Sequence, residues 1–301
     1  MNKLFCRGYS WGWCAVRGDY QNPRAYESMK KMRDIGCDWI SICFYAHQDS
    51  YFSTRIYFDY EDTPTDRDVE TAILHAKELG MKVCLKPIVN CRDGLWRARI
   101  RFPDDAEAET YWGQWFRSYT AFIEHYAQIA QRYGCEMFCV GCEMVGTEHR
   151  TDNWRQVLRR VRANYTGLVV YNLQHDSQEP CEWLDLLDVV GMSAYYPVGG
   201  TDPGRDKLTQ MRENWERIAP GIEEICQRTG KPVLFMEIGC QSVENAAQTP
   251  WGARGDMVSE EEQAPFYGVS QRGGKAPAPR HEAGGVRQQR RPGECNRPGG
   301  V

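Results

Sequence analysis

The sequence predicts an α/β protein of the (β/α)8 TIM-barrel class, with the eighth β/α unit missing or replaced. Short apolar segments alternate with longer amphipathic ones, as in a parallel sheet whose strands are buried on both faces. No glycine-rich phosphate-binding loop follows any apolar segment, which favours a barrel over a doubly wound sheet. A length of 301 residues with 42% hydrophobic side chains suits one such barrel.

Seven segments are predicted as strands because each is short and almost continuously apolar. They are Leu4–Ser10, Asp38–Phe44, Met81–Pro87, Glu136–Gly141, Leu168–Asn172, Val189–Ala194 and Pro232–Glu237.

The segments between the strands have apolar residues at helical spacing and are predicted as helices. They are Arg24–Ile35, Asp66–Leu79, Ala106–Tyr133, Asn153–Asn164, Glu182–Leu187 and Asp206–Thr229. Several of them are followed directly by glycine, which commonly ends a helix. One helix carries an aromatic stripe that is predicted to face the core, at Trp112, Trp115, Tyr119 and Phe122.

The alternation of strands and helices stops at about Gln263. Residues 264–301 contain no Leu, Ile, Met or Trp, and thirteen of them are Gly or Pro. Such a segment cannot bury enough apolar surface to offset the entropy lost on ordering. We therefore predict a barrel domain over residues 1–263 and a disordered Gly/Pro/Arg-rich tail over residues 264–301. A reading-frame change or a truncated gene end would produce such a tail.

Charge and cysteine content predict the environment of the protein. A formal net charge of −4 and a pI near 5.9 argue against nucleic acid as the main partner. No stretch approaches the ~18 consecutive apolar residues of a membrane span, and no secretory signal is visible before Arg7. The thirteen cysteines lie mostly in apolar segments, which favours reduced thiols over disulfides. The sequence thus predicts a cytoplasmic protein that binds neither nucleic acid nor membrane.

Two carboxylates stand at the ends of the fourth and seventh predicted strands. They are Glu143 and Glu237. Barrel active sites lie at the carboxyl ends of the strands. Hydrolysis of a glycosidic bond requires one carboxyl group to protonate the leaving oxygen and another to attack or to activate water. We predict Glu143 as the acid/base and Glu237 as the nucleophile, kept ionised by a hydrogen bond from a group such as Tyr195.

Other strand-end residues are predicted to bind a substrate in the barrel mouth. Flat aromatic faces stack on pyranose rings, and Trp13 and Trp96 are placed for this role. The predicted substrate-binding residues are Trp13, Lys86, Asn90, Trp96, Arg97, Asn172, Tyr195 and Tyr196. An alternative reading is that both glutamates are structural residues paired with Lys86, Arg92 or Arg97.

A cysteine spacing suggests a different chemistry. Cys135, Cys139 and Cys142 have the C-x3-C-x2-C spacing associated with radical iron–sulfur enzymes. Cys135 and Cys139 bracket a predicted strand, and at about 3.3 Å per residue they stand roughly 13 Å apart, too far for one cluster. No second C-x-x-C motif supports a zinc site, so we predict neither a metal nor another cofactor.

Four strand-end motifs together resemble glycoside hydrolase family 113. They are LKPIVNCRDGLWR, FCVGCEM, VVGMSAYYPV and GKPVLFMEIGCQS, and the resemblance spans about residues 5–262. It implies a barrel of the retaining glycosidase clan that hydrolyses β-1,4-mannosidic bonds in mannan or manno-oligosaccharides. By motif, the acid/base falls on Glu143 in GCEM and the nucleophile on Glu237 in FMEIG. Tyr195 in AYYP matches the tyrosine that donates a hydrogen bond to the nucleophile.

Two departures from this pattern leave other functions open. Cys142 stands where many members of the clan carry an asparagine that binds the sugar 2-hydroxyl. The clan also supplies a tryptophan from the end of the eighth strand, and no tryptophan follows Trp251. The alternatives are a hydrolase of another β-1,4-glycan, of xylan or glucan type, and a catalytically inactive carbohydrate-binding barrel.

Overall fold

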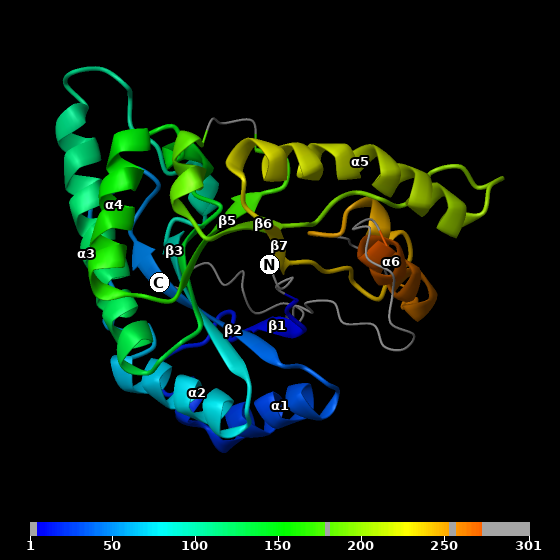
Figure 1. Ribbon diagram of the computed structural model, residues 1–301, viewed down its shortest axis with the longest axis horizontal. Coiled ribbons are helices and arrows are strands. Elements are labelled where there is room, and N and C mark those ends of the chain that lie inside the picture. Colours follow the sequence, from blue (N-terminus) through cyan, green and yellow to red (C-terminus); the bar gives the residue numbers. More distant parts are fainter. Residues whose placement is uncertain (1–4, 178–180, 253–256, 273–301) are drawn as a thin grey trace.

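The computed structural model describes residues 5–177, 181–252 and 257–272. Seven strands alternate with helices along these residues (Figure 1). The strands are β1 (Gly8–Trp11), β2 (Trp39–Gln48), β3 (Lys82–Cys91), β4 (Met137–Cys142), β5 (Leu168–Gln174), β6 (Val189–Ser193) and β7 (Val233–Glu237). The α-helices are α1 (Pro23–Asp34), α2 (Asp66–Glu78), α3 (Glu109–Arg132), α4 (Thr151–Asn164), α5 (Lys207–Thr229) and α6 (Glu260–Arg272). The 3-10 helices are η1 (Asp19–Gln21), η2 (Arg97–Arg99), η3 (Val145–Thr147), η4 (Glu182–Leu186) and η5 (Ala246–Gln248).

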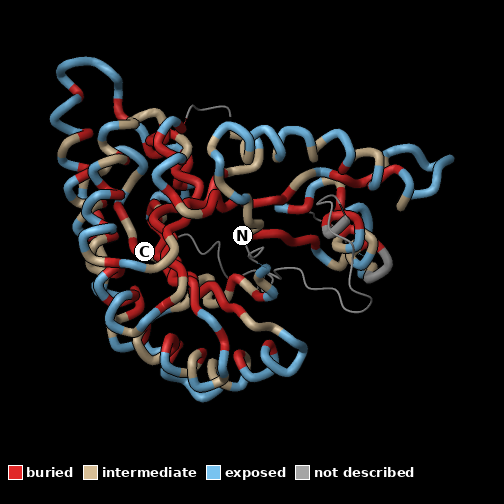
Figure 2. The backbone as a smooth tube through the Cα atoms, in the orientation of Figure 1, coloured by how far each residue is buried: buried red, intermediate tan, exposed pale blue. Residues whose placement is uncertain are grey.

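The strands form one parallel sheet in the order β1 to β7, in which each strand pairs with the next along the chain. Helices α1 to α5 lie around the outside of this curved sheet (Figure 1), and side chains of the strands, such as Trp39, Met137 and Met236, pack together on its inner face. The strands are consequently buried on both faces (Figure 2), and all six residues of β4 are buried. The predicted barrel architecture is therefore confirmed.

Helix α3 packs on the sheet through the predicted aromatic stripe. Trp112, Trp115, Tyr119 and Phe122 are at most 1% exposed, which confirms that the stripe faces the core. The rings of Trp115 and Tyr119 stack with centroids 4.8 Å apart. Although α3 has 24 residues, no helix in the described part of the chain is both long and apolar enough to cross a membrane.

Several elements differ in extent from the prediction. Strands β2, β3 and β5 end at Gln48, Cys91 and Gln174, two to four residues later than predicted. These extensions contain polar residues. Because the prediction rests on apolar segments, it stopped before the true ends of the three strands. The helix predicted over Glu182–Leu187 is the 3-10 helix η4.

The chain stays helical beyond the predicted domain boundary at residue 263. Helix α6 continues to Arg272, and Phe266 and Val269 are 1% and 3% exposed. These two side chains are three residues apart, so both lie on one face of the helix and pack on the rest of the molecule. The tail predicted over residues 264–301 otherwise falls on residues 273–301, which lie outside the described residues.

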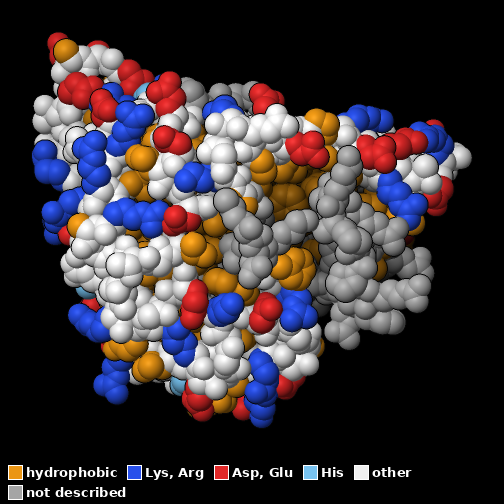
Figure 3. Space-filling model, viewed as in Figure 1, with side chains coloured by type: hydrophobic (Ala, Val, Ile, Leu, Met, Phe, Trp, Pro, Cys, Tyr) orange, Lys and Arg blue, Asp and Glu red, His pale blue; other side chains and the backbone are white. Residues whose placement is uncertain are grey.

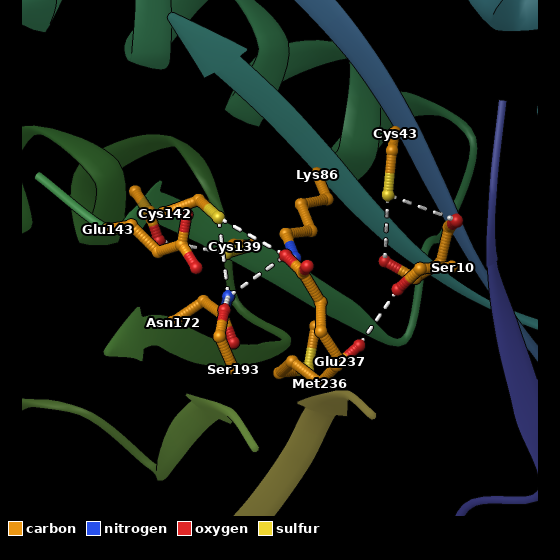
Figure 4. Close-up of polar contacts among 12 residues, drawn as sticks. Ser10, Cys43, Lys86, Cys139, Cys142, Glu143, Asn172, Ser193, Met236 and Glu237 are labelled. Carbon is orange, nitrogen blue, oxygen red and sulfur yellow. Dashed lines mark hydrogen bonds and ion pairs between the residues drawn. The ribbon is translucent and has the colours of Figure 1, made fainter. Parts of the chain in front are cut away.

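The barrel is nearly closed with seven strands. Within the described residues no eighth strand lies between β7 and β1, which are the two edges of the sheet. Three residues of β7 are only partly buried, Val233, Leu234 and Phe235. Hydrophobic side chains are also visible beside α5 on the face shown in Figure 3. A hydrogen bond connects the two edges: the buried Ser10 hydroxyl donates to the Met236 carbonyl oxygen at 2.8 Å (Figure 4).

This hydrogen bond gives a stability prediction. Ser10→Ala leaves the Met236 carbonyl without this donor and should lower the free energy of unfolding by about 1 kcal/mol. Urea denaturation followed by circular dichroism measures the change. Thr201→Ala, at an exposed position, should leave the free energy of unfolding within about 0.5 kcal/mol of the wild-type value. Equal stability of the Ser10 and Thr201 variants would show that the bond does not hold the edges together.

Candidate active site

A cavity of about 450 Å³ contains both predicted catalytic glutamates. This volume lies within the range of small-ligand sites, roughly 300–1,000 Å³. The walls come from the segments that follow β1 and β3, from the ends of β5 and β7, and from nearby loops. The lining residues are Trp13, Tyr45, Trp96, Arg97, Glu143, Gln174, His175, Asp176, Tyr195, Glu237 and Trp251.

A β-bulge precedes each of the two glutamates. Between β4 and β5 the register moves three residues along β4, from Cys139 to Cys142, for two along β5. Between β6 and β7 it moves two residues along β7, to Glu237, for one along β6. A bulge adds one residue to a strand and thereby changes the direction of the side chains that follow. Both strands therefore aim a carboxylate into the mouth of the barrel.

Glu143 is held in a left-handed backbone conformation, with φ +52°. Non-glycine residues rarely adopt this conformation, and it persists where the surroundings impose it. The Glu143 amide donates to the Asn172 carbonyl oxygen at 2.8 Å, which fixes the chain to β5. At Gly141 an added Cβ would lie 2.6 Å from the Tyr171 ring, so the bulge also requires glycine. The fold thus maintains strain at the position of the predicted acid/base.

Glu237 is surrounded by hydrogen-bond donors from four strands or strand ends, and Figure 4 shows three of them, Lys86, Cys142 and Asn172. The Lys86 ammonium on β3 donates to Oε1 at 2.6 Å, and the Asn172 amide on β5 donates to the same atom at 3.2 Å. The Cys142 thiol also donates to Oε1, at 3.4 Å. The Tyr195 hydroxyl donates to Oε2 at 3.1 Å, as the sequence predicts. These hydrogen bonds therefore fix the orientation of the Glu237 carboxylate.

This environment keeps Glu237 ionised. The side chains of Lys86 and Glu237 are 0% and 3% exposed. Burial by itself would raise the pKa of Glu237, but the Lys86 ammonium, and after it the Arg97 guanidinium, bring the pKa below its ordinary value near 4.5. Burial raises the pKa of the Cys142 thiol, which therefore stays protonated and able to donate. The result is a buried, oriented carboxylate anion.

Glu143 has a different set of partners. The Arg97 guanidinium contacts Glu143 Oε2 at 2.7 Å, and the Trp96 indole nitrogen donates to the same oxygen at 3.2 Å. Arg97 is itself fixed, because it also donates to the Cys142 carbonyl at 3.0 Å and to the Asn90 side chain at 3.1 Å. Within the described residues both hydrogen bonds to the Glu143 side chain reach Oε2.

The eight predicted substrate-binding residues fall into two groups. Half of them line the cavity, namely Trp13, Trp96, Arg97 and Tyr195. The other half, Lys86, Asn90, Asn172 and Tyr196, are absent from its lining and lie behind its wall. Lys86 and Asn172 contact Glu237 there, and Asn90 holds Arg97. Arg92, considered as a partner of the glutamates, instead pairs with Glu61 at 2.7 Å.

Sequence reasoning missed five lining residues, which are Tyr45, Gln174, His175, Asp176 and Trp251. Tyr45 and Gln174 belong to the strand extensions that the apolar pattern did not reveal. His175, Asp176 and Trp251 lie in loops, where periodicity gives no signal. Trp251 lines the cavity and is 50% exposed.

The cysteine spacing does not assemble a metal centre in the described part of the chain. No group of three or more His, Cys, Asp or Glu side chains there is placed to hold a metal ion. Cys139 and Cys142 are buried, and the Cys142 sulfur accepts a hydrogen bond from Asn172 at 3.2 Å. Cys142 is thus part of the polar contacts around Glu237.

Comparisons with known proteins identify the family to which the chain belongs. The family model for Glycoside Hydrolase Family 113 matches residues 9–273. A solved GH113 β-1,4-mannanase complex is 37% identical, over 90% of this chain and 84% of its own, with a TM-score of 0.80. The GH113 β-mannanase AaManA from Alicyclobacillus acidocaldarius, solved in complex with ManMIm, is 35% identical, over 90% of this chain and 83% of its own, with a TM-score of 0.81. A search of the curated proteins finds no match. The chain belongs to glycoside hydrolase family 113 and is a glycoside hydrolase.

Proposed function

We propose that this glycoside hydrolase cleaves β-1,4-mannosidic bonds in mannan or manno-oligosaccharides with retention of configuration. The observation that carries the proposal is the pair of buried carboxylates, Glu143 and Glu237, which line one cavity from two bulged strand ends. The mannan substrate is supported by solved β-mannanases that are 35% and 37% identical to this chain.

The different surroundings of the two glutamates suit two different roles. Glu237, ionised and oriented by four donors, attacks the anomeric carbon of the sugar and forms a glycosyl ester. Glu143 gives a proton to the glycosidic oxygen as the bond to the leaving sugar breaks. Glu143 then takes a proton from the water that attacks the ester, which releases the sugar and restores Glu237. Arg97 and Trp96 both hold Oε2 of Glu143, so Oε1 is the atom available for proton transfer.

Azide separates the two roles. Glu237→Ala should lose turnover, and azide should restore it on an activated aryl β-mannoside with α-mannosyl azide as the product, because azide then replaces the nucleophile. Glu143→Ala should slow hydrolysis by roughly 10²–10⁴-fold. In that variant azide attacks the glycosyl ester, so the product should be β-mannosyl azide. Nuclear magnetic resonance identifies the anomer.

A third glutamate serves as the control for this experiment. Glu244 is exposed in the loop after β7, and Glu244→Ala should retain wild-type activity without azide. If Glu237→Ala gave the β-azide and Glu143→Ala the α-azide, the roles assigned to Glu143 and Glu237 would have to be exchanged. Full activity of a folded Glu237→Ala variant would contradict the mechanism.

A panel of oligosaccharides tests the sugar. Mannotetraose should be cleaved with a higher kcat/KM than xylotetraose or cellotetraose, because a pocket discriminates sugars through hydrogen bonds to individual hydroxyls. Chromatography of the products measures each rate. Faster cleavage of a xylan or glucan fragment would favour the other β-1,4-glycan. Binding of mannotetraose without cleavage would identify an inactive carbohydrate-binding barrel.

The Lys86–Glu237 pair predicts the acidic limb of the pH profile. Lys86→Met removes the charge that lowers the pKa of Glu237, so burial then raises this pKa. The ionised nucleophile is consequently lost at a higher pH, and the acidic limb of kcat/KM should move to higher pH. Lys86→Arg keeps the charge and should keep the limb near its wild-type position. An unmoved limb in a folded Lys86→Met variant would show that another group sets it.

A further inference from the structure

A buried carboxylate that the proposed mechanism does not use, Glu148, lies close to Glu143 along the chain. It directly follows the 3-10 helix η3 and is 0% exposed. It is not among the residues that line the cavity with Glu143 and Glu237. Glu148 is therefore not placed to touch a substrate, and any effect that it has on the reaction must pass through its contacts.

The Glu148 carboxylate is held by hydrogen bonds at both of its oxygens. Oε1 accepts a hydrogen bond from the Tyr171 hydroxyl at 2.7 Å. Oε2 accepts from the Ser177 hydroxyl at 3.0 Å and from the Cys181 thiol at 3.4 Å. The Trp183 indole nitrogen donates to the Glu148 backbone carbonyl oxygen at 2.9 Å. Glu148 is therefore fixed to β5 and to the segment that follows this strand.

Tyr171 connects Glu148 to the residue that follows Glu143. The Tyr171 hydroxyl oxygen accepts a hydrogen bond from the Met144 amide at 2.9 Å. Burial, and after it the charge of Glu148, raises the pKa of Tyr171, so the hydroxyl keeps its proton. A hydroxyl has one proton to donate, and Tyr171 donates it to Glu148. Glu148 therefore sets the direction of the Tyr171 hydroxyl, whose oxygen then faces the Met144 amide.

The Tyr171 ring is held in place by the core. It is 0% exposed, and its centroid lies 5.2 Å from the Trp154 ring and 4.9 Å from the Trp183 ring, both in edge contact. The bulge of β4 packs directly on it, because an added Cβ at Gly141 would lie 2.6 Å from this ring. Packing that locks a side chain fixes the position of its polar group. The core thus places the Tyr171 hydroxyl beneath the bulge.

The amides on both sides of the Glu143 side chain are tied to β5. The Glu143 amide donates to the Asn172 carbonyl oxygen at 2.8 Å. The next amide, that of Met144, donates to the Tyr171 hydroxyl. The left-handed backbone of Glu143, with φ +52°, lies between these two bonds. Because such a conformation persists only where the surroundings impose it, loss of the Tyr171 bond permits Glu143 to relax and its carboxylate to turn away.

We propose that Tyr171 and Glu148 are positioning residues that hold Glu143 in its left-handed conformation. The Glu148 carboxylate orients the Tyr171 hydroxyl, and the hydroxyl holds the amide that follows Glu143. The inference rests on the proposed function, in which Glu143 gives a proton to the glycosidic oxygen. Proton transfer requires the acid within hydrogen-bond reach of that oxygen, and a displacement of about 1 Å can lower the rate by roughly 10²-fold.

Substrates with different leaving groups test the position of the acid. Dinitrophenolate departs with little protonation, whereas phenolate needs a proton from Glu143. Tyr171→Phe keeps the ring and removes the hydroxyl, so kcat/KM on phenyl β-mannobioside should fall by roughly tenfold to a hundredfold. On 2,4-dinitrophenyl β-mannobioside, kcat/KM should change by less than about twofold. Initial rates of phenol release measure both values.

Variants of Glu148 test the same hydrogen bonds from the other end. Glu148→Leu removes the acceptor of the Tyr171 proton and should give the same selective loss, which keeps the inference testable if Tyr171→Phe does not fold. Glu148→Gln retains an acceptor oxygen and should recover most of the activity on the phenyl substrate. A general loss of stability would not distinguish the two substrates.

Tyr165→Phe is the matched control. It removes a similarly buried hydroxyl, which donates to the Cys135 carbonyl oxygen at 2.7 Å before the start of β4, and it should leave both rates unchanged. Equal losses on the two substrates in folded Tyr171→Phe or Glu148→Leu, or no loss on either, would overturn the inference. Glu143→Ala should lose far more activity on the phenyl than on the dinitrophenyl substrate, and equal losses there would overturn the proposed function itself.

Discussion

The ion pair between Lys86 and Glu237 is the constraint on which the rest of the site depends. Both groups are almost completely buried, and the ammonium lies 2.6 Å from the carboxylate. Removing two charges from water costs several kcal/mol per ion, which is recovered only with good geometry and further hydrogen bonds. Asn172, Cys142 and Tyr195 supply those bonds. Because β3 and β7 are not neighbours in the sheet, the pair exists only when the sheet curves into a barrel.

The bulges explain how two apolar strands present carboxylates in the cavity. An apolar strand buried on both faces has no natural place for a carboxylate, since an unpaired buried charge is strongly unfavourable. The extra residue before each glutamate redirects the chain at the point where the strand leaves the sheet. At Glu143 this redirection includes a left-handed backbone and a neighbouring glycine. The surrounding core, which is packed by large aromatic side chains, supplies the stability that maintains this strain.

The seven-stranded sheet places the weakest part of the barrel next to the site. Glu237 directly follows Met236, whose carbonyl accepts the hydrogen bond that joins the two sheet edges. β7 is also the strand with three partly buried apolar residues. Glu237, the proposed nucleophile, is nevertheless held by donors from β3, β4, β5 and the segment after β6. Its position therefore depends mainly on the continuous part of the sheet and less on the open edge.

The sequence by itself determined the fold class, the seven strands and the position of the two glutamates at strand ends, because apolar periodicity and strand-end position are local properties of a chain. It also indicated the hydrogen bond from Tyr195, through a motif. Only the tertiary structure decided that Lys86 and Asn172 support Glu237 from behind the wall while Trp251 and His175 line the cavity. It also decided that α6 extends past residue 263. These facts depend on which distant segments meet across the barrel mouth, and loops and bulges leave no periodic signal of that meeting.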